Sequence, residues 1–267
     1  MSNNFTLSYQ VFELVNMVRN DPSSFIQILS DNIKYFRGNV YMKPGDDAIQ
    51  TVEGRAGFEE AIDFLKIQNP VPSLTLSEHL SNACRDHVND IGNRGVALHG
   101  SSDGSNASDR IERYCEWDGA LAENIEFGSK TAEDVVISWI VDDGVKNRTH
   151  RTNLFHPIFK FAGVGFGEHI KYGNMCVMNY TAGVRNKGEE SPYVNNYIDK
   201  PFKQSKNAFQ EEDPDAPDNV ISVKYQNRIK MINGKEIKIT KKIIKNTFCI
   251  ILMTEISYTK RQPSRKL

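Results

Sequence analysis

The chain has 267 residues, a length that allows one good-sized core, or one domain plus an appendage. Of these residues 39% are hydrophobic and 25% charged, a composition typical of a globular protein. No apolar run approaches the ~18 residues of a membrane-spanning helix, and the first residues do not resemble a secretory signal, so we expect neither. The net charge of −1 conceals an asymmetry: residues 219–267 carry 12 Lys/Arg and two Asp/Glu (+10), whereas residues 1–218 carry −11. An acidic body with a basic tail indicates a binding surface at one end.

The cysteines point to a reducing compartment. Cys84, Cys115, Cys176 and Cys249 include no C-x-x-C pair, and four are too few for a disulfide-stapled scaffold. Since the start of the sequence also lacks the features of a leader, we expect free thiols and a cytoplasmic location.

Apolar periodicity predicts a helical first half and a strand-rich second half. We expect helices over residues 7–18, 21–33, 58–65, 77–91 and 131–139, with a loop at 38–54 and strands at 161–166 and 175–180. Gly163, Gly165 and Gly167 lie in the first of these strands with no helix directly after them, so they are expected to allow close packing or strand bending rather than to bind a dinucleotide. His87, on an apolar helix face, is interpreted as a core histidine.

The C-terminal part has a different character. Residues 186–218 are polar and contain four prolines, which predicts a linker or an extended surface segment. Two alternating runs then flank Asn233 and Gly234, a strong signal for a β-hairpin.

Histidines and carboxylates gather between residues 99 and 150. His99 lies in ALHGSSDG, Glu123 in ALAENIEFG, Asp142 and Asp143 in SWIVDDG, and His150 in KNRTHRTNLFHP. Imidazoles beside carboxylates are the groups that hold a divalent metal or move a proton.

The order of these motifs, followed by G-V-G-F-G and C-V-M-N-Y, resembles the CAP superfamily of cysteine-rich secretory proteins, antigen 5 and pathogenesis-related 1 proteins, whose domain is also called SCP. The resemblance covers residues 7–185 and is to the cysteine-poor members of bacteria and single-celled eukaryotes. It implies an α+β fold, a three-layer α-β-α sandwich with a mainly antiparallel central sheet. We therefore divide the chain into a CAP domain at 1–185, a linker at 186–218 and a basic hairpin extension at 219–267.

The resemblance also implies a cleft that holds two histidines and two acids. Matched motif by motif, these are His99, Glu123 and His150, with Asp142 as the second acid because it follows the tryptophan by three positions. Helical spacing is compatible with either Asp142 or Asp143, and both remain candidates.

Departures from the family pattern bear on the expected function. Ala122 and Thr149 stand where glycines precede the glutamate and the second histidine. Because the family has no generally established catalytic activity, we expect a non-catalytic module in which the four side chains form a polar network. The alternative is a metal-dependent hydrolase, with His99 and His150 as zinc ligands and Glu123 as base, or a binder of a small ligand or lipid.

We predict that the basic hairpin docks on an acidic protein surface, such as that of tubulin or another assembly component. Nucleic acid is less favoured because the extension offers few rings for base stacking, Tyr225 and Phe248 among them. A cytoskeletal or ciliary assembly is the kind of partner that we expect for such a docking element. The predicted partner-binding residues are Lys224, Arg228, Lys230, Lys235, Lys238, Lys241 and Lys242.

Overall fold

The structure is a computed structural model, and it describes residues 3–189, 220–232, 235–246 and 250–258. In the last three ranges only the backbone is described. None of the described helices is long and apolar enough to cross a membrane. The linker predicted at 186–218 lies outside the described residues from position 190 onward.

The described strands form one large sheet and one small one. The large sheet has seven strands in the order β4-β6-β7-β5-β10-β9-β8, and every neighbouring pair is antiparallel except β4 and β6. Its strands are β4 (Thr75–Leu76), β5 (Cys115–Phe127), β6 (Phe161–His169), β7 (Gly173–Asn186), β8 (Val220–Ile232), β9 (Lys235–Asn246) and β10 (Ile250–Tyr258). The small sheet joins β1 (Phe36–Arg37), β2 (Val40–Tyr41) and β3 (Ile49–Gln50).

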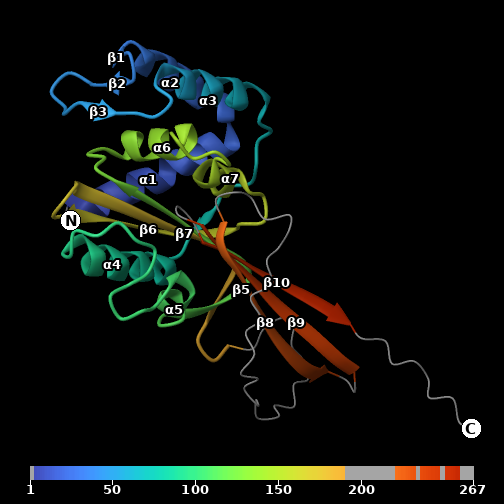
Figure 1. Cartoon of the computed structure of the whole chain (residues 1–267). Helices are drawn as coiled ribbons and strands as arrows, with labels where there is room; N and C mark the ends of the chain where they lie inside the picture. The colour runs from blue at the N-terminus through green and yellow to red at the C-terminus, as the bar shows by residue number, and fades with distance from the viewer. Residues whose placement is uncertain (1–2, 190–219, 233–234, 247–249, 259–267) are drawn as a thin grey trace, which may run out of the picture.

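Helices cover both faces of the β6-β7-β5 part of the large sheet (Figure 1). One face carries α1 (Asn3–Asn20), α6 (Ala132–Val141) and α7 (Thr149–Phe155), and the other carries α4 (Glu78–Gly92) and α5 (Ala107–Ile111). A 3-10 turn at Pro22–Phe25, α2 (Ile26–Ile33) and α3 (Arg55–Ile67) pack beyond α1 and α6. The α+β sandwich with a mainly antiparallel sheet is therefore confirmed.

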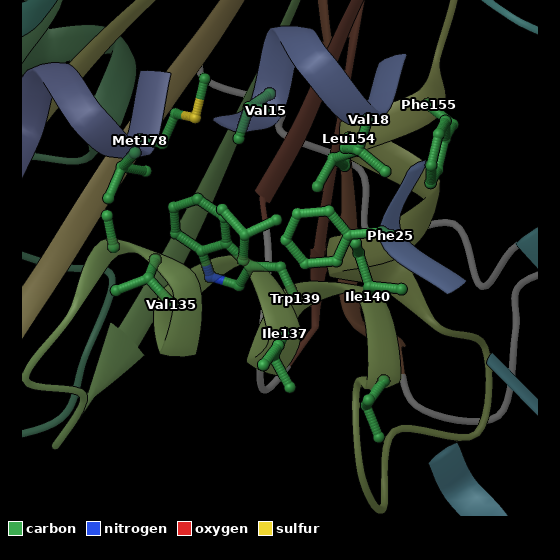
Figure 2. Close-up of a cluster of buried hydrophobic side chains, with 14 of the residues drawn as sticks. Val15, Val18, Phe25, Val135, Ile137, Trp139, Ile140, Leu154, Phe155 and Met178 are labelled. Atoms are coloured by element: carbon green, nitrogen blue, oxygen red, sulfur yellow. The ribbon is translucent and has the colours of Figure 1, made fainter. Parts of the chain in front are cut away.

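The larger hydrophobic core lies between the sheet and α1 and α6, around Trp139 (Figure 2). Trp139 is 1% exposed and lies with Val15, Phe25 and Met178, side chains from a helix, a turn and a strand that are distant in the sequence. Burying such a large aromatic side chain contributes on the order of 3 kcal/mol to folding. α6 is apolar on nearly all sides because it packs against α1, α3 and β5.

Two glycines of β6 allow α4 to lie directly on the sheet. A Cβ atom at Gly163 would come within 2.2 Å of the backbone at Leu80 and Ser81, and one at Gly165 within 2.8 Å of the backbone at Cys84. Close packing, one of the roles expected of these glycines, is thus what Gly163 and Gly165 allow between β6 and α4. The contact fixes α4, and with it the loop that follows α4 and carries His99.

The C-terminal extension continues the central sheet. β8 and β9 pair antiparallel across residues 233–234, as the Asn-Gly signal predicts, and β9 then pairs with β10. β10 joins the body by pairing with β5, with Ile250 opposite Glu123 and Met253 opposite Ala120. In Figure 1 these three strands project away from the helical layers. A third strand in the extension was not predicted from the sequence.

Candidate functional site

Glu123 on β5 is the centre of the first cluster of the predicted residues. Its Oε1 atom lies 2.8 Å from Nδ1 of His99, and its Oε2 atom lies 2.5 Å from Nη2 of Arg110. The side chains of Glu123 and Arg110 are almost fully buried, so this is an ion pair inside the protein. His99 is held at the edge of this pair with its side chain 12% exposed.

Arg110 also fixes the loop that carries His99. Its Nη1 atom donates to the carbonyl of His99 and to Oγ of Ser101, both at 3.0 Å. The arginine stands on the short helix α5, which begins with a capping box formed by Asn106 and Asp109. A single guanidinium therefore joins the loop, α5 and β5.

His87 holds the same loop from α4. Its Nε2 atom lies 2.9 Å from the carbonyl oxygen of Leu98, and its Nδ1 atom lies 3.2 Å from Oγ of Ser101. Burial lowers the pKa of His87 to about 4, so the ring is neutral near pH 7. With the ring neutral, Nε2–H donates to the carbonyl and Nδ1 accepts from the hydroxyl.

The charge of Glu123 is set by opposing effects. Burial favours the protonated carboxyl, but the charge of Arg110 and the hydrogen bond from His99 outweigh it and hold the pKa of Glu123 well below its usual range. A carboxylate this acidic is a weak proton acceptor. Its ionised form instead anchors Arg110 and His99.

Asp142 is the centre of the second cluster. It ends α6 in the left-handed conformation, with φ of 54°, a region in which aspartate is more common than most non-glycine residues. Its Oδ1 atom lies 2.6 Å from Nδ1 of His150, and its Oδ2 atom accepts the backbone N–H of His150 at 2.8 Å. One carboxylate thus fixes both the ring of His150 and the start of α7.

Asp143, the other candidate for the second acid, points elsewhere. Its carboxylate accepts the backbone N–H groups of Val52 and Glu53 at 2.7 and 2.8 Å. Glu53 in turn forms a bidentate ion pair with Arg148, at 2.5 and 2.6 Å. Asp143 therefore ties the segment before α3 to the α6–α7 loop, and the acid paired with His150 is Asp142.

The two histidine–carboxylate pairs lie on opposite faces of the sheet. Glu123 points toward α4 and α5, whereas the side chain of Asn124 points toward α7, where it donates to the carbonyl of His150 at 3.0 Å. β10 pairs with β5 at Ala120–Glu123, so this pairing reaches the residue that holds His99. The described structure therefore shows two separate clusters.

These residues do not fit a preformed zinc site in their described arrangement. Among the residues with described side chains, no three His, Cys, Asp or Glu side chains converge in a way that could hold a metal ion. Both oxygens of Glu123 are occupied by His99 and Arg110, and Asp142 accepts from two groups of His150. A zinc site that uses both histidines remains a prediction.

Sequence reasoning did not identify Arg110 and Asn124. Both are fully buried polar residues, and each makes hydrogen bonds to one of the histidine segments. A role for Asn124 in holding the second histidine segment could have been inferred from its position. It directly follows Glu123, so in a strand its side chain faces the opposite side of the sheet. Nothing local distinguishes Arg110 from the other arginines of its segment.

The predicted partner-binding cations belong to the extension. Lys224, Arg228 and Lys230 lie on β8, and the remaining four lie on β9. Their backbones form one paired ladder, in which Lys224 stands opposite Ile243 and Arg228 opposite Ile239.

Comparison with known proteins agrees with this architecture. Residues 13–180 match the model of the CAP family, described as the cysteine-rich secretory protein family, and the chain belongs to that family. A 95-residue segment is 30% identical to the uncharacterized protein YkwD of Bacillus subtilis (strain 168), and it covers 36% of this chain and 35% of YkwD.

Two solved structures are similar over about half of the chain. An extracellular protein containing an SCP domain from Bacillus anthracis (strain Ames) is 19% identical with a TM-score of 0.34, and the match covers 46% of this chain and 38% of that one. An outer surface protein of Borrelia burgdorferi is 16% identical with a TM-score of 0.35, over 49% of this chain and 90% of that one. The match to YkwD and the match to the Bacillus anthracis protein thus each span well under half of the relative's length.

Proposed function

We propose that this chain is an intracellular, non-catalytic CAP-domain module that docks into a larger protein assembly through its basic C-terminal extension. The observation that carries the proposal is the pairing of β10 with β5, because it makes β8, β9 and β10 part of the central sheet. A docking element that continues the central sheet is connected to the body by backbone hydrogen bonds as well as by the chain itself. The three cysteines whose surroundings are described are buried and unpaired, which supports a reducing compartment.

The non-catalytic part of the proposal is supported by the two carboxylates. Glu123 is held ionised by Arg110, and Asp142 accepts two hydrogen bonds from His150. A general base needs a pKa near the working pH, and the pKa of Glu123 is far below it. Glu123 is therefore better suited to fixing the loop of His99 than to accepting a proton, and Asp142 is engaged with the ring and the backbone of His150.

The partner class follows from the charge of the extension. The local charge of +10 on residues 219–267 favours an acidic protein surface, and acidic tails of tubulin in a cytoskeletal or ciliary assembly are the example we propose. Such attraction is long-ranged and weakens with salt, since the Debye length is about 8 Å at physiological ionic strength. Nucleic acid is the alternative acidic partner, so the experiment must also measure binding to it.

Co-sedimentation of the full chain with microtubules and with double-stranded DNA tests this proposal. We expect binding to microtubules at low salt that falls as salt rises, and no stronger binding to DNA. Replacing Lys238, Lys241 and Lys242 by Gln should weaken microtubule binding several-fold. A matched variant with Lys34, Lys66 and Lys171 replaced by Gln, all exposed on the body, should bind as the unmodified chain does. Equal loss in both variants would contradict docking through the extension.

A zinc-binding function is a second candidate, because both histidines are held by carboxylates at Nδ1. In zinc proteins this arrangement fixes the ring so that Nε2 faces the metal. Metal analysis of protein purified without chelator decides between the two candidates. Near-stoichiometric zinc that is lost in the His99→Ala/His150→Ala double variant would favour the second candidate, and its absence in both proteins would leave the first.

A further inference from the structure

The edge of β6 that faces away from β7 has no strand partner at Phe166–Glu168. β4 pairs with this edge only at Phe161 and Ala162, because the chain then turns into α4 at Ser77. At the next outward position, the N–H of Val164 donates to Oγ of Ser81. Strand alternation places the N–H groups of Phe166 and Glu168 on this same outward side. Beyond these positions Gly92, at the end of α4, packs against the carbonyl of Glu168 and accepts the N–H of Ile170. The stretch without a strand partner is therefore limited to Phe166–Glu168.

The open stretch faces a groove of about 440 Å³, the larger of two adjoining hollows in the described part of the molecule. Phe166, Gly167 and Glu168 form its floor. One wall comes from the first turns of α1, and the other from α4. The wall residues include Asn4, Phe5, Ser8, Arg85, Val88 and Asn89.

Within the described residues, the outward N–H groups of Phe166 and Glu168 form no hydrogen bond with the walls. Unpaired backbone groups at a strand edge are a template for another extended chain. A strand edge that lies beside a helix is also how several peptide-binding domains capture an extended ligand, with backbone bonds providing affinity and wall side chains providing selectivity.

The walls indicate which side chains the ligand should carry. Phe5 and Tyr9 are each 49% exposed at the α1 wall, so they offer apolar surface that a ligand side chain would cover. Arg85 and Glu78 are paired with each other and neutralise their charges. The remaining carboxylate of the groove, on Glu168, is exposed and makes no ion pair with a described residue.

We propose that this groove binds an extended peptide segment of a partner protein, which adds as a strand to β6 at Phe166–Glu168. The segment carries an apolar side chain that packs on Phe5 and a lysine or arginine that pairs with Glu168. In the strand order of the sheet, the groove lies at β6 and the extension begins at β10, with β7 and β5 between them. The inference therefore does not depend on docking through the extension.

Selection from a displayed library of random octapeptides on the full chain tests the proposal. We expect enrichment of extended sequences that combine apolar and basic residues and lack proline. In hydrogen exchange of the free protein, the amides of Phe166 and Glu168 should exchange faster than those of Gly165 and Gly167, which point toward β7. Addition of a selected peptide should slow the two outward amides.

Variants at one exposed position separate the backbone and the charge contributions. Glu168→Pro removes the outward N–H without removing a bond to β7, and should weaken a selected peptide about fivefold or more beyond Glu168→Ala, which removes the carboxylate alone. Glu168→Ala should weaken basic peptides about threefold, in a salt-dependent way. Phe5→Asp should also weaken binding, whereas Ile67→Asp, at an apolar residue exposed far from the groove, should not.

Three results would overturn the proposal. The first is no enrichment over the Glu168→Pro protein. The second is that selected peptides bind both Glu168 variants and Phe5→Asp as tightly as they bind the unmodified chain. The third is slow exchange of the Phe166 amide in the free protein, because it would mean that this edge is already paired.

Discussion

Glu123 and Asn124 are neighbours on β5, yet each holds one histidine segment, and they do so from opposite faces of the sheet. Glu123 bonds the ring of His99 at 2.8 Å, and Asn124 bonds the main chain of His150 at 3.0 Å. Strand alternation alone produces this division, since successive side chains point to opposite sides. The E-N pair of the family motif is thus a double anchor, and its two members can be tested separately.

The structure predicts that Asn124→Ala destabilises the protein by about 2–3 kcal/mol. Asn124 is fully buried, donates to the carbonyl of His150 and accepts from Nδ2 of Asn153 at 2.9 Å. Its loss leaves buried groups without partners. Chemical denaturation measures the effect, with the exposed Asn89→Ala as control. A change at Asn124 as small as that of the control would contradict the anchoring role.

The buried ion pair predicts a specific acid sensitivity. Because the folded-state pKa of Glu123 is depressed, its contribution to stability is complete above the unfolded-state value of about 4.3 and is lost as the pH falls further. Glu123→Gln should lower the free energy of unfolding by about 3 kcal/mol at pH 7, since it leaves Arg110 buried without a counter-charge.

The same variant should lose less stability than the unmodified chain between pH 4 and pH 2, while the exposed Glu59→Gln should behave as the unmodified chain does. Urea denaturation across this range distinguishes the outcomes. Parallel curves for Glu123→Gln and the unmodified chain would show that the pair does not control acid stability.

For Glu126 we predict a pH dependence of stability opposite to that of Glu123. Burial raises the pKa of this carboxyl to about 7, so the folded state binds a proton more tightly than the unfolded state. Its contribution is therefore present at low pH and is lost as the pH rises from about 4.3 through 7. Glu126→Gln should stabilise the protein by about 2 kcal/mol at pH 8 and much less at pH 4. Thermal unfolding at both values checks this, and destabilisation at pH 8 would contradict it.

The contact of β6 with α4 predicts that Gly163→Ala costs about 3 kcal/mol, because a Cβ atom there would collide with helix backbone that cannot rotate away. Gly100→Ala is the matched control, since nothing lies within 4 Å of a Cβ atom at that position. Its effect should stay below about 1 kcal/mol. Similar denaturation midpoints for the two variants would mean that α4 is not seated as described.

Much of the body could be predicted from local patterns. The helices at α1, α3, α4 and α6 follow apolar spacing. Asp21, Ser77 and Thr131, residue types that favour the position before a helix, each accept a hydrogen bond from a backbone N–H. The strands β6 and β7 contain the two predicted apolar runs and extend beyond them. These signals are local, so a single sequence contains them.

Other elements could not be predicted because they depend on distant partners. β5 is buried at most positions, with helices covering both of its faces, so it shows no alternation of apolar and polar residues. β10 becomes a strand of the central sheet only by pairing with β5 and β9. The short strands β2 and β3 lie in the segment 38–54 that was predicted as a loop, and they pair with each other and with β1 just before it. Asp143 anchors the end of this segment by accepting the backbone N–H groups of Val52 and Glu53.

The site shows the same limit. The motif order leads to His99, Glu123 and His150, but the choice between Asp142 and Asp143 depends on a left-handed residue that ends α6. The separation of the two pairs depends on strand alternation at β5, which was not predicted as a strand. The identity of the residues was therefore accessible, whereas their arrangement required the fold.

The most direct test of the proposed function is the affinity of the full chain for microtubules at low and high salt, compared between the two matched triple variants. The proposal predicts that replacing Lys238, Lys241 and Lys242 by Gln weakens binding several-fold at low salt, and that replacing Lys34, Lys66 and Lys171 does not. Binding that is insensitive to salt and equal in both variants would contradict docking through the basic extension.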